Sequence, residues 1–186
     1  MNGGVDFAGM IHRMIRAAML DAQVFEEVEH DPSKDQEALM AVLFVAVVNG
    51  VLAFPISLIM GHGFVQALIS LVFGVVWTVI GYYLYAYLAF YIGTLLFQGQ
   101  ADFGELRRVL GYAYAPSIVS WIPCIGPLVA AVWSFVAGVV AIRQALDVDT
   151  TKALLTALIS IAVIFILAIV LGSILGAGAV GVGAIR

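Results

Sequence analysis

The chain has 186 residues, of which 63% are hydrophobic and 11% are charged, and its formal net charge is −4. About a quarter of the residues in an ordinary soluble domain are charged, so this composition excludes that class and predicts an integral membrane protein. The single cysteine, Cys124, has no partner for a disulfide within the chain or for a metal site of the usual spacing, so redox chemistry is not indicated.

The N-terminal head is predicted to contain an amphipathic helix. At helical spacing, one stripe carries the apolar side chains of Phe7, Ile11 and Met14, and Arg13 and Arg16 stand beside it. One interpretation places this helix at the membrane surface, with the stripe between headgroups and acyl chains and the arginines on anionic phosphates. The other docks it on the transmembrane bundle or on a partner protein. An apolar stripe does not distinguish lipid from protein, so both stay open.

Long stretches without Asp, Glu, Lys or Arg predict the membrane-spanning part. They cover residues 38–101, 109–142 and 153–185, and about 20 apolar residues cross a hydrocarbon core of roughly 30 Å. We expect residues 64–97 to form one long tilted helix, because no turn cluster interrupts them. The five predicted crossings are residues 38–61, 64–97, 106–122, 126–142 and 150–176.

Helix-start chemistry precedes several of these crossings. Asp31 before Pro32 is typical of a helix N-terminus. Asp102-x-x-Glu105 has the spacing of a capping box. Asp149 or one of the two threonines after it is expected to cap the last helix.

The distribution of charge predicts the orientation of this all-α, polytopic fold. With residues 64–97 as a single crossing, seven of the eight basic residues and all twelve acidic residues fall on one side, and Arg186 lies opposite. Basic residues in short loops favour the cytoplasm, so we predict a cytoplasmic N-terminus and a C-terminus outside. The predicted parts are a cytoplasmic amphipathic head (1–37), a five-helix transmembrane domain (38–176) and a flexible glycine-rich tail (177–186).

Three prolines interrupt the apolar stretch that follows residue 109. Pro123 and Pro127 are expected to form the turn between the third and fourth crossings, because proline is tolerated at the first turn of a helix. Pro116 lies within the third crossing and is expected to kink it, which frees backbone carbonyls that need partners in lipid. Ser117 and Ser120 are candidate partners.

Five tyrosines crowd the end of the long second crossing. They are Tyr82, Tyr83, Tyr85, Tyr87 and Tyr91. We interpret them as an aromatic belt with phenol groups at the headgroups, and the alternative is a ligand-stacking surface.

Polar groups elsewhere indicate structure rather than catalysis. Away from their ends, the predicted crossings lack the charged residues on which proton relays and ion-coupled transporters depend. Asn49 is expected to form an interhelical hydrogen bond, and the alternative is that it lines a site. Ser117, Ser120 and Cys124 have no base within inferable reach. The segment FEEVEHD lacks a recognised metal-ligand spacing and is interpreted as a solvated face. We expect no catalytic residue, metal, cofactor or nucleic-acid partner.

Residues 103–155 combine several features into a recognisable pattern. These are a basic pair, a Gly-Tyr-x-x-x-Pro element, a proline-rich outer turn, a tryptophan-containing span and a lysine at a helix start, here Arg107, Arg108, Gly111, Tyr112, Pro116, Pro123, Pro127, Trp133 and Lys152. The pattern resembles the Yip domain family, whose eukaryotic founders are Ypt/Rab-interacting membrane proteins. The resemblance implies five transmembrane helices, a cytoplasmic N-terminus and, for a bacterial-type member, the prokaryotic plasma membrane.

The resemblance also suggests a role. Eukaryotic members look like organisers of vesicle traffic that act with small GTPases, but the Asp-Leu-Tyr-Gly-Pro stretch associated with them is absent here, so GTPase binding is not carried over. We predict a non-enzymatic protein that organises membrane or membrane-protein assemblies through its head and basic loop, with lipid and a membrane-protein partner or further copies of itself. The alternatives are a small permease or lipid-handling protein that uses the Pro116 kink, or an accessory subunit of a larger complex.

Overall fold

In the part of the chain that the computed structural model describes, residues 6–183 with side chains as far as residue 173, every regular element is a helix. Its elements are α1 (Phe7–Ala18), α2 (Ala22–Glu29), the 3₁₀ turn η1 (Pro32–Lys34), α3 (Asp35–Ile59), α4 (Phe64–Phe97), α5 (Phe103–Ala113), the 3₁₀ helix η2 (Ala115–Trp121), α6 (Gly126–Ala145) and α7 (Thr150–Gly183).

Four helices in the described region are long and apolar enough to cross a membrane. They are α3 with η1, α4, α6 and the first 24 residues of α7. The expectation of one long helix over residues 64–97 is confirmed, because α4 runs through all 34 of these residues. Helix length and composition therefore make this chain an integral membrane protein.

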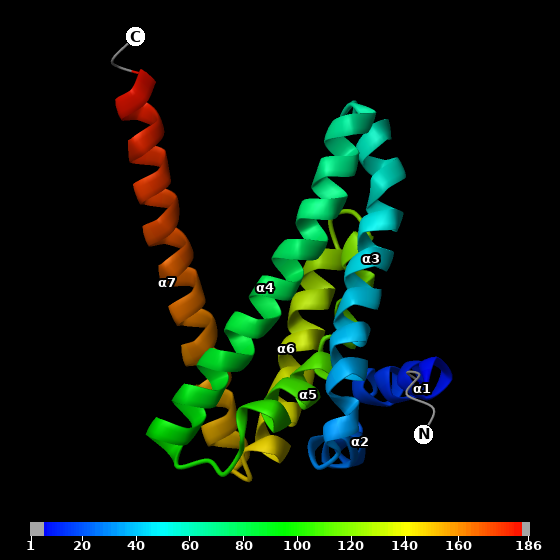
Figure 1. The fold of residues 1–186 in the computed structure, drawn as a ribbon, viewed down its shortest axis with the longest axis vertical. Coiled ribbons are helices and arrows are strands. Elements are labelled where there is room, and N and C mark those ends of the chain that lie inside the picture. Colours follow the sequence, from blue (N-terminus) through cyan, green and yellow to red (C-terminus); the bar gives the residue numbers. More distant parts are fainter. Residues whose placement is uncertain (1–5, 184–186) are drawn as a thin grey trace.

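The expected third crossing, residues 106–122, is not one continuous helix, which corrects the predicted kink to a break. The α-helix α5 ends at Ala113, and η2 continues from Ala115 with Pro116 in its first turn. At roughly 1.5 and 2 Å per residue, the two segments together reach about 30 Å. They lead from the lower end of the bundle toward the α3–α4 turn, and α6 returns (Figure 1).

Polar side chains satisfy the backbone at this break, as the hydrogen-bonding requirement of a membrane interior demands. The Ser117 hydroxyl donates to the Tyr114 carbonyl at 2.7 Å. The Asn49 amide of α3 donates to the Ser117 carbonyl at 2.9 Å. Both expectations are confirmed: Ser117 is a local partner, and Asn49 makes an interhelical hydrogen bond.

Three of the predicted helix starts are confirmed. Asp102 and Glu105 form a complete capping box on α5, with both hydrogen bonds at 2.7 Å. Asp149 caps α7 by accepting from the Lys152 amide at 3.0 Å. Pro127 lies in the first turn of α6, where its missing N–H removes no helical hydrogen bond.

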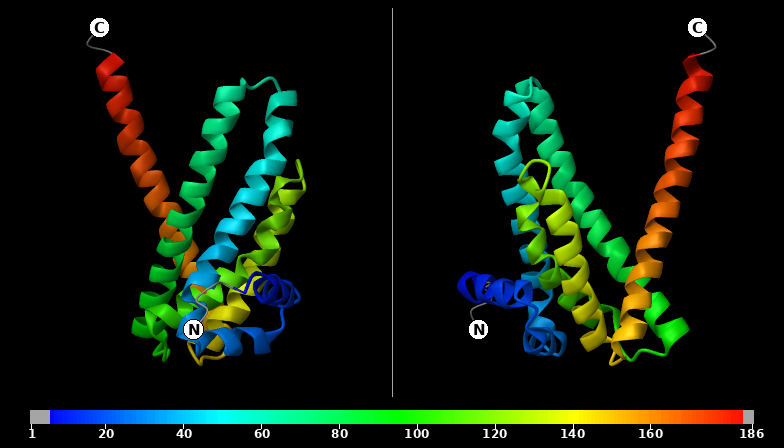
Figure 2. Two further views of the ribbon diagram at one scale, coloured as in Figure 1. Left: turned by 45° about the vertical axis from the view of Figure 1, so that its right-hand side comes forward. Right: turned by 180° about the vertical axis from the view of Figure 1, so that it is seen from behind.

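The head packs on the side of the bundle. Its helix α1 lies across the transmembrane helices, and α2 continues below it (Figure 1, Figure 2). Leu20, with φ of 62°, turns the chain between them. Met10, Met14 and Ala17 of α1 are buried in the same core cluster as residues of α3, α5 and α6. One face of helix α1 therefore packs against the rest of the protein.

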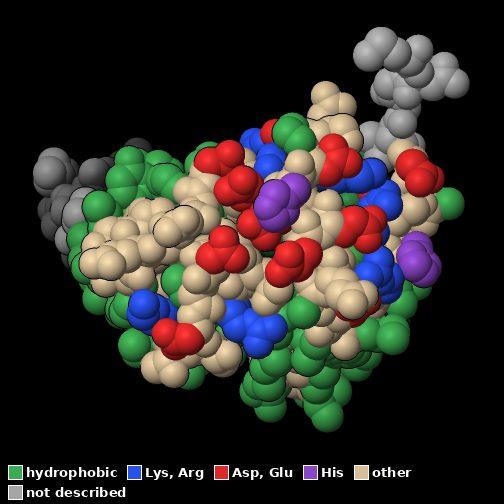
Figure 3. All heavy atoms as spheres, turned by 90° about the horizontal axis from the view of Figure 1, so that it is seen from below, with side chains coloured by type: hydrophobic (Ala, Val, Ile, Leu, Met, Phe, Trp, Pro, Cys, Tyr) green, Lys and Arg blue, Asp and Glu red, His purple; other side chains and the backbone are tan. Residues whose placement is uncertain are grey.

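The charged residues gather at one end of the molecule, which we call the charged end. It comprises α2, η1, the α4–α5 and α6–α7 connections and the adjoining turns of the helices (Figure 3). The α3–α4 turn and the described end of α7 lie at the opposite end (Figure 1). The backbone of α7 is helical to Gly183, through most of the expected tail 177–186, whereas residues 184–186, with Arg186, lie outside the described residues.

Candidate functional site

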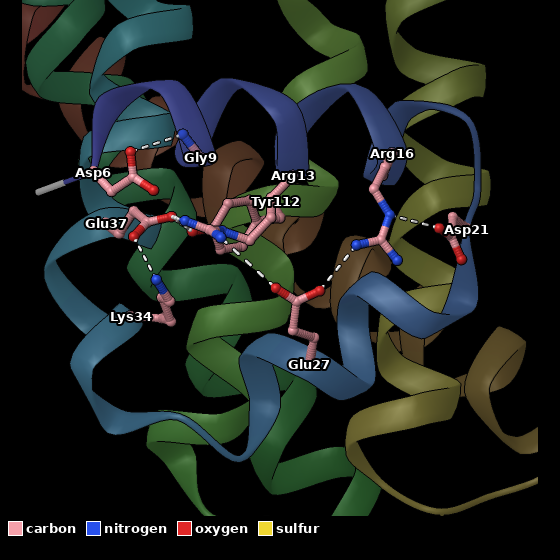
Figure 4. A network of polar contacts seen from close by, with 9 residues as sticks. All are labelled: Asp6, Gly9, Arg13, Arg16, Asp21, Glu27, Lys34, Glu37 and Tyr112. Carbon is pink, nitrogen blue, oxygen red and sulfur yellow. Dashed lines mark hydrogen bonds and ion pairs between the residues drawn. The ribbon is translucent and has the colours of Figure 1, made fainter.

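The most closely organised polar site lies where the head meets the bundle, and Glu37 is at its centre (Figure 4). The carboxylate accepts hydrogen bonds from Arg13 Nε at 2.8 Å, from Tyr112 OH at 2.6 Å and from Lys34 Nζ at 3.0 Å. A second guanidinium nitrogen of Arg13 also contacts it. The Glu37 side chain is 4% exposed. A buried carboxylate is stable only when such partners replace its water, so Glu37 ties α1 to α3 and α5.

Arg108 forms a second, equally buried centre. Its guanidinium donates to the carbonyls of Val28, at 3.1 Å, and Glu29, at 3.0 Å, in the last turn of α2. It also donates to Asp35 Oδ1 at 3.0 Å. The last carbonyls of a helix lack partners within the helix and carry partial negative charge, so a guanidinium is a suitable cap for them. Arg108 therefore fixes the end of α2 against α5.

Asp35 joins this centre to the neighbouring arginine. Arg107 Nη2 lies 2.6 Å from Asp35 Oδ2, and its guanidinium stands 5.8 Å from the centroid of the Tyr83 ring. The Tyr82 hydroxyl donates to the Arg107 carbonyl at 2.8 Å. Asp35 thus bridges both arginines, and α4 contributes two tyrosines. We call the set Arg13, Lys34, Asp35, Glu37, Arg107, Arg108 and Tyr112 the head clamp.

Gly111 allows the close contact between α5 and α3 at the head clamp. A Cβ built at this glycine would lie 2.9 Å from both the Cβ and the carbonyl oxygen of Ala38, which is closer than real side chains approach. The α5 backbone therefore packs directly on α3, and this contact brings the hydroxyl of Tyr112 to Glu37. In the Gly-Tyr pair of the sequence pattern, Gly111 thus allows the close contact of α5 with α3, and Tyr112 donates the hydrogen bond to Glu37.

Helix α6 holds the other end of the head. Trp133 Nε1 donates to the Ala18 carbonyl at 2.7 Å, at the last turn of α1. The Gln144 amide donates to a carboxylate oxygen of Glu26 on α2. The end of α1 and the middle of α2 are therefore attached to α6 by groups that sequence periodicity does not reveal.

The residues predicted to touch the membrane surface fall into two groups. Met14 is buried against the bundle, and Ile11 is half-buried beside it. Phe7 is 52% exposed and packs edge-on against Phe44 of α3 at a centroid distance of 5.7 Å.

The two head arginines have partners within the chain. Arg13 binds Glu37, and Arg16 binds Asp21 at 2.8 Å and Glu27 at 2.9 Å.

Sequence reasoning missed three acidic residues of this site. Asp35 and Glu37 follow the predicted helix start at Asp31 and Pro32, and Glu29 lies in the segment interpreted as a solvated face, yet Glu37 and Glu29 are buried. Two charged residues in the first turn of a long apolar helix were the available signal, because a charge at a membrane boundary requires a partner. Within the described residues, no group of three or more His, Cys, Asp or Glu is placed to hold a metal ion.

Burial makes the Glu29 carboxyl an unusually weak acid. The pKa of its carboxyl is raised from 4.5 to about 7, mainly by desolvation. The charge of His30 opposes this rise, and the nearby carboxylates of Asp147, Glu105 and Glu26 contribute to it. The pKa of His30 is itself raised, first by a hydrogen bond to the Glu26 carbonyl and then by the charge of Glu29.

A comparison with models of known families identifies the family of this chain. The Yip1 domain matches residues 20–172, which is most of the chain. The chain belongs to the Yip1 domain family. No curated protein and no solved structure matches it significantly. The expected family is confirmed, and the Yip1 family is one of non-enzymatic membrane proteins.

The residues that carry the family pattern have different positions in this Yip1 domain protein. Arg107, Arg108, Gly111 and Tyr112 all lie at the clamp, and Trp133 binds the end of α1. The prolines Pro116, Pro123 and Pro127 lie at the α5 break and the outer turn, and Lys152 takes part in the α7 cap through its backbone amide. The pattern therefore describes how the head is attached and how the α5–η2 segment is built.

Replacing Glu37 by Gln should destabilise the protein strongly. Removing one charge leaves Arg13 and Lys34 without their buried counter-ion, and breaking a buried ion pair costs about 3–5 kcal/mol. The measurement is the unfolding midpoint of the purified protein in detergent, together with protease sensitivity of the head. Glu27→Gln is the matched control, because its side chain is 46% exposed and its pairs should contribute about 1 kcal/mol or less. Equal changes in both variants would contradict the central position of Glu37.

The raised pKa of Glu29 predicts that stability falls as pH rises. The folded-state pKa of about 7 lies above the ordinary 4.5, so the folded protein retains a proton that the unfolded chain loses, and stability decreases between those values. Unfolding midpoints measured from pH 5 to pH 8 should show this decrease. Glu29→Gln should flatten the profile and be more stable than the unsubstituted protein at pH 8.

A His30→Gln variant measures how much the neighbouring imidazole contributes to this pH dependence, because its raised pKa also lowers stability as pH rises. A Glu29→Gln protein that loses stability with pH as steeply as the unsubstituted protein would exclude Glu29 as the cause.

Proposed function

We propose that this Yip1 domain protein is a non-enzymatic organiser of membrane or of membrane-protein assemblies that acts through α1. The observation that carries the proposal is that α1 has two apolar faces, of which the bundle covers one. Met10, Met14 and Ala17 face the bundle, whereas Ile15 and Met19 are 55% and 72% exposed. An uncovered apolar face on a helix lying across the bundle suits the interface between headgroups and acyl chains, or a partner there.

The head clamp supports this proposal because it makes α1 a fixed feature of the protein. A helix on a flexible tether binds a membrane independently of the domain behind it. A helix held by Glu37 and Trp133 instead keeps one position relative to α3 and α6. Arg108 contributes by holding the end of α2, and Arg107 contributes by pairing with Asp35 of α3, so this basic pair of α5 supports the head instead of contacting a partner itself.

The proposed orientation places the charged end in the cytoplasm of a prokaryotic cell, with the C-terminus outside. Replacing Gln100 by Cys in a Cys124→Ala background should give a protein that an impermeant thiol reagent labels only after permeabilisation, since Gln100 lies in the α4–α5 connection. His62→Cys, in the α3–α4 turn, is the matched control and should react in intact cells. The reverse pattern of labelling would overturn the orientation.

Replacing Phe7, Ile15 and Met19 together by Ser tests the organising role. These side chains are exposed, so the protein should insert and fold normally while its native assembly is reduced to the size of the isolated protein. The measurement is extraction in polymer nanodiscs without overexpression, followed by sizing and identification of co-isolated proteins. His12→Ser, which changes an exposed polar side chain of α1 and removes none of the apolar side chains, is the control. An unchanged assembly in the triple variant would contradict the proposal.

A second candidate, a permease or lipid-handling protein, is favoured by one observation. Beside the break in the third crossing lies a cavity of about 260 Å³ that Asn49, Thr78, Tyr114 and Ser120 help to line. Interrupted helices beside a cavity are common in transporters. This cavity supports the binding of a molecule within the membrane, whether or not that molecule is moved.

A further inference from the structure

The hairpin formed by α5, η2 and α6 reaches less far than the helix beside it. Gly111 of α5 packs on Ala38 of α3, so these two residues lie at one level, beside the head clamp. From Gly111 to the end of η2 at Trp121 the chain advances less than about 20 Å, whereas α3 continues for about 30 Å from Ala38 to Ile59. The hairpin therefore turns back before α3 ends.

Contacts on both arms of the hairpin agree with this difference. Trp121, the last residue of η2, lines a cavity together with Ala53 of α3, and residues 54–59 of α3 lie beyond that level. On the other arm, Trp133 bonds the end of α1, and residues 126–132 of α6 extend only about 10 Å past it. The turn between η2 and α6 accordingly lies below the α3–α4 turn (Figure 1, Figure 2).

The exposed apolar surface of the two helices differs in the same way. On α3 it runs from Met40 to Ile59, about 29 Å, which matches a hydrocarbon core of roughly 30 Å. On α6 it runs only from Leu128 to Val136, about 12 Å. The later turns of α6 are largely buried and pack against α2, α5 and α7. The hairpin thus offers lipid an apolar surface for about half of the core thickness.

The turn at the tip of the hairpin is suited to hydrocarbon. It has the sequence IPCIGP, residues 122–127, which contains no charged residue, and Cys124 and Ile125 are exposed on the protein surface. The N–H groups of Ile122, Ile125 and Gly126 each bond a nearby carbonyl, and the two prolines have no N–H. An irregular backbone within a membrane needs its polar groups satisfied by the protein itself, and this turn meets that need at these positions.

We propose that residues 103–145 form a re-entrant hairpin, which enters the bilayer from the charged end, turns near the middle and returns to the same side. By this hairpin the protein favours and stabilises membrane that is convex on the side of the charged end. The bilayer is then crossed by α3, α4 and α7. Both termini keep the sides proposed above, because the hairpin returns to the side from which it entered.

The preference for curvature follows from the unequal volume of protein in the two leaflets. In the leaflet next to the charged end, η2 and α6 lie beside α3, α4 and α7, whereas of the described helices only the latter three continue through the opposite leaflet. Each added helix is about 10 Å across. Insertion into a single leaflet expands that leaflet, so binding depends on curvature. This inference rests on the organising role proposed above and names the curved bilayer as what is organised.

Cys124 is a natural probe of the tip. It is exposed on the protein, so lipid shields it if the hairpin is re-entrant, and water reaches it if the hairpin crosses. In nanodiscs both membrane faces are open to the solution, which makes the result independent of orientation. An impermeant maleimide should leave Cys124 unlabelled in nanodiscs and should label it after unfolding in SDS. Rapid labelling in nanodiscs would overturn the hairpin.

Two variants in a Cys124→Ala background complete this experiment. Ile125→Cys should be shielded like Cys124, and because the Ile125 side chain is 61% exposed, local packing is excluded as the cause. His62→Cys, in the α3–α4 turn, is the matched control and should be labelled in nanodiscs. Labelling of Ile125→Cys as fast as that of His62→Cys would also contradict the hairpin.

Membrane tubes pulled from giant vesicles test the preference for curvature. The full-length His62→Cys, Cys124→Ala protein carries a dye and is reconstituted in phosphatidylcholine and phosphatidylglycerol. An impermeant quencher in the outer solution removes the signal of copies whose α3–α4 turn faces outward, so the remaining signal comes from copies with the charged end outward. The ratio of this signal to that of a lipid dye should rise as the tube narrows. An equal ratio on tube and vesicle would overturn the proposed activity.

The Phe7, Ile15 and Met19 triple variant separates this inference from the role of α1. It leaves the hairpin intact, so Cys124 should stay shielded and the signal on tubes should still rise. A rise that disappears in the triple variant would assign the preference to α1 and overturn the role of the hairpin. A retained rise together with an unchanged native assembly would contradict only the organising role of α1.

Discussion

The burial of one carboxylate and one guanidinium at the membrane boundary is the constraint on which the arrangement of this protein depends. Glu37 and Arg108 are almost inaccessible, so each must find its partners within the chain. Those partners come from α1, α2, α3 and α5. Satisfying both charges together fixes the head, α3 and α5 relative to one another.

The break between α5 and η2 follows a related rule farther from the charged end. Pro116 ends the α-helical hydrogen bonding, and carbonyls freed in a nonpolar environment need donors. Ser117 and Asn49 supply them, but Asn49 keeps one oxygen unpaired beside a cavity.

Two features of this protein depend on different interactions. Helix α1 presents apolar side chains where polar and nonpolar surroundings meet, and ionic contacts below it fix its position. A cavity between α4 and α7 is lined without charged side chains and lies near the middle of the bundle. Helices α5 and α6 run between the two sites, since both contact the head and line the cavity.

The amino-acid sequence by itself determined the membrane class, the long α4 helix, the capping of α5 and α7, and the gathering of charge at one end, because hydropathy and capping act over a few neighbouring residues. It also indicated that Asn49 would bond another helix, although not which carbonyl. Only the tertiary structure decided that Arg13 binds Glu37, that Arg108 caps α2, that Tyr82 and Tyr85 turn inward instead of forming the interfacial belt, and that α7 leaves a cavity beside Ser134. Such contacts join residues 24 to 80 positions apart, and the burial that makes them obligatory exists only once the helices have packed.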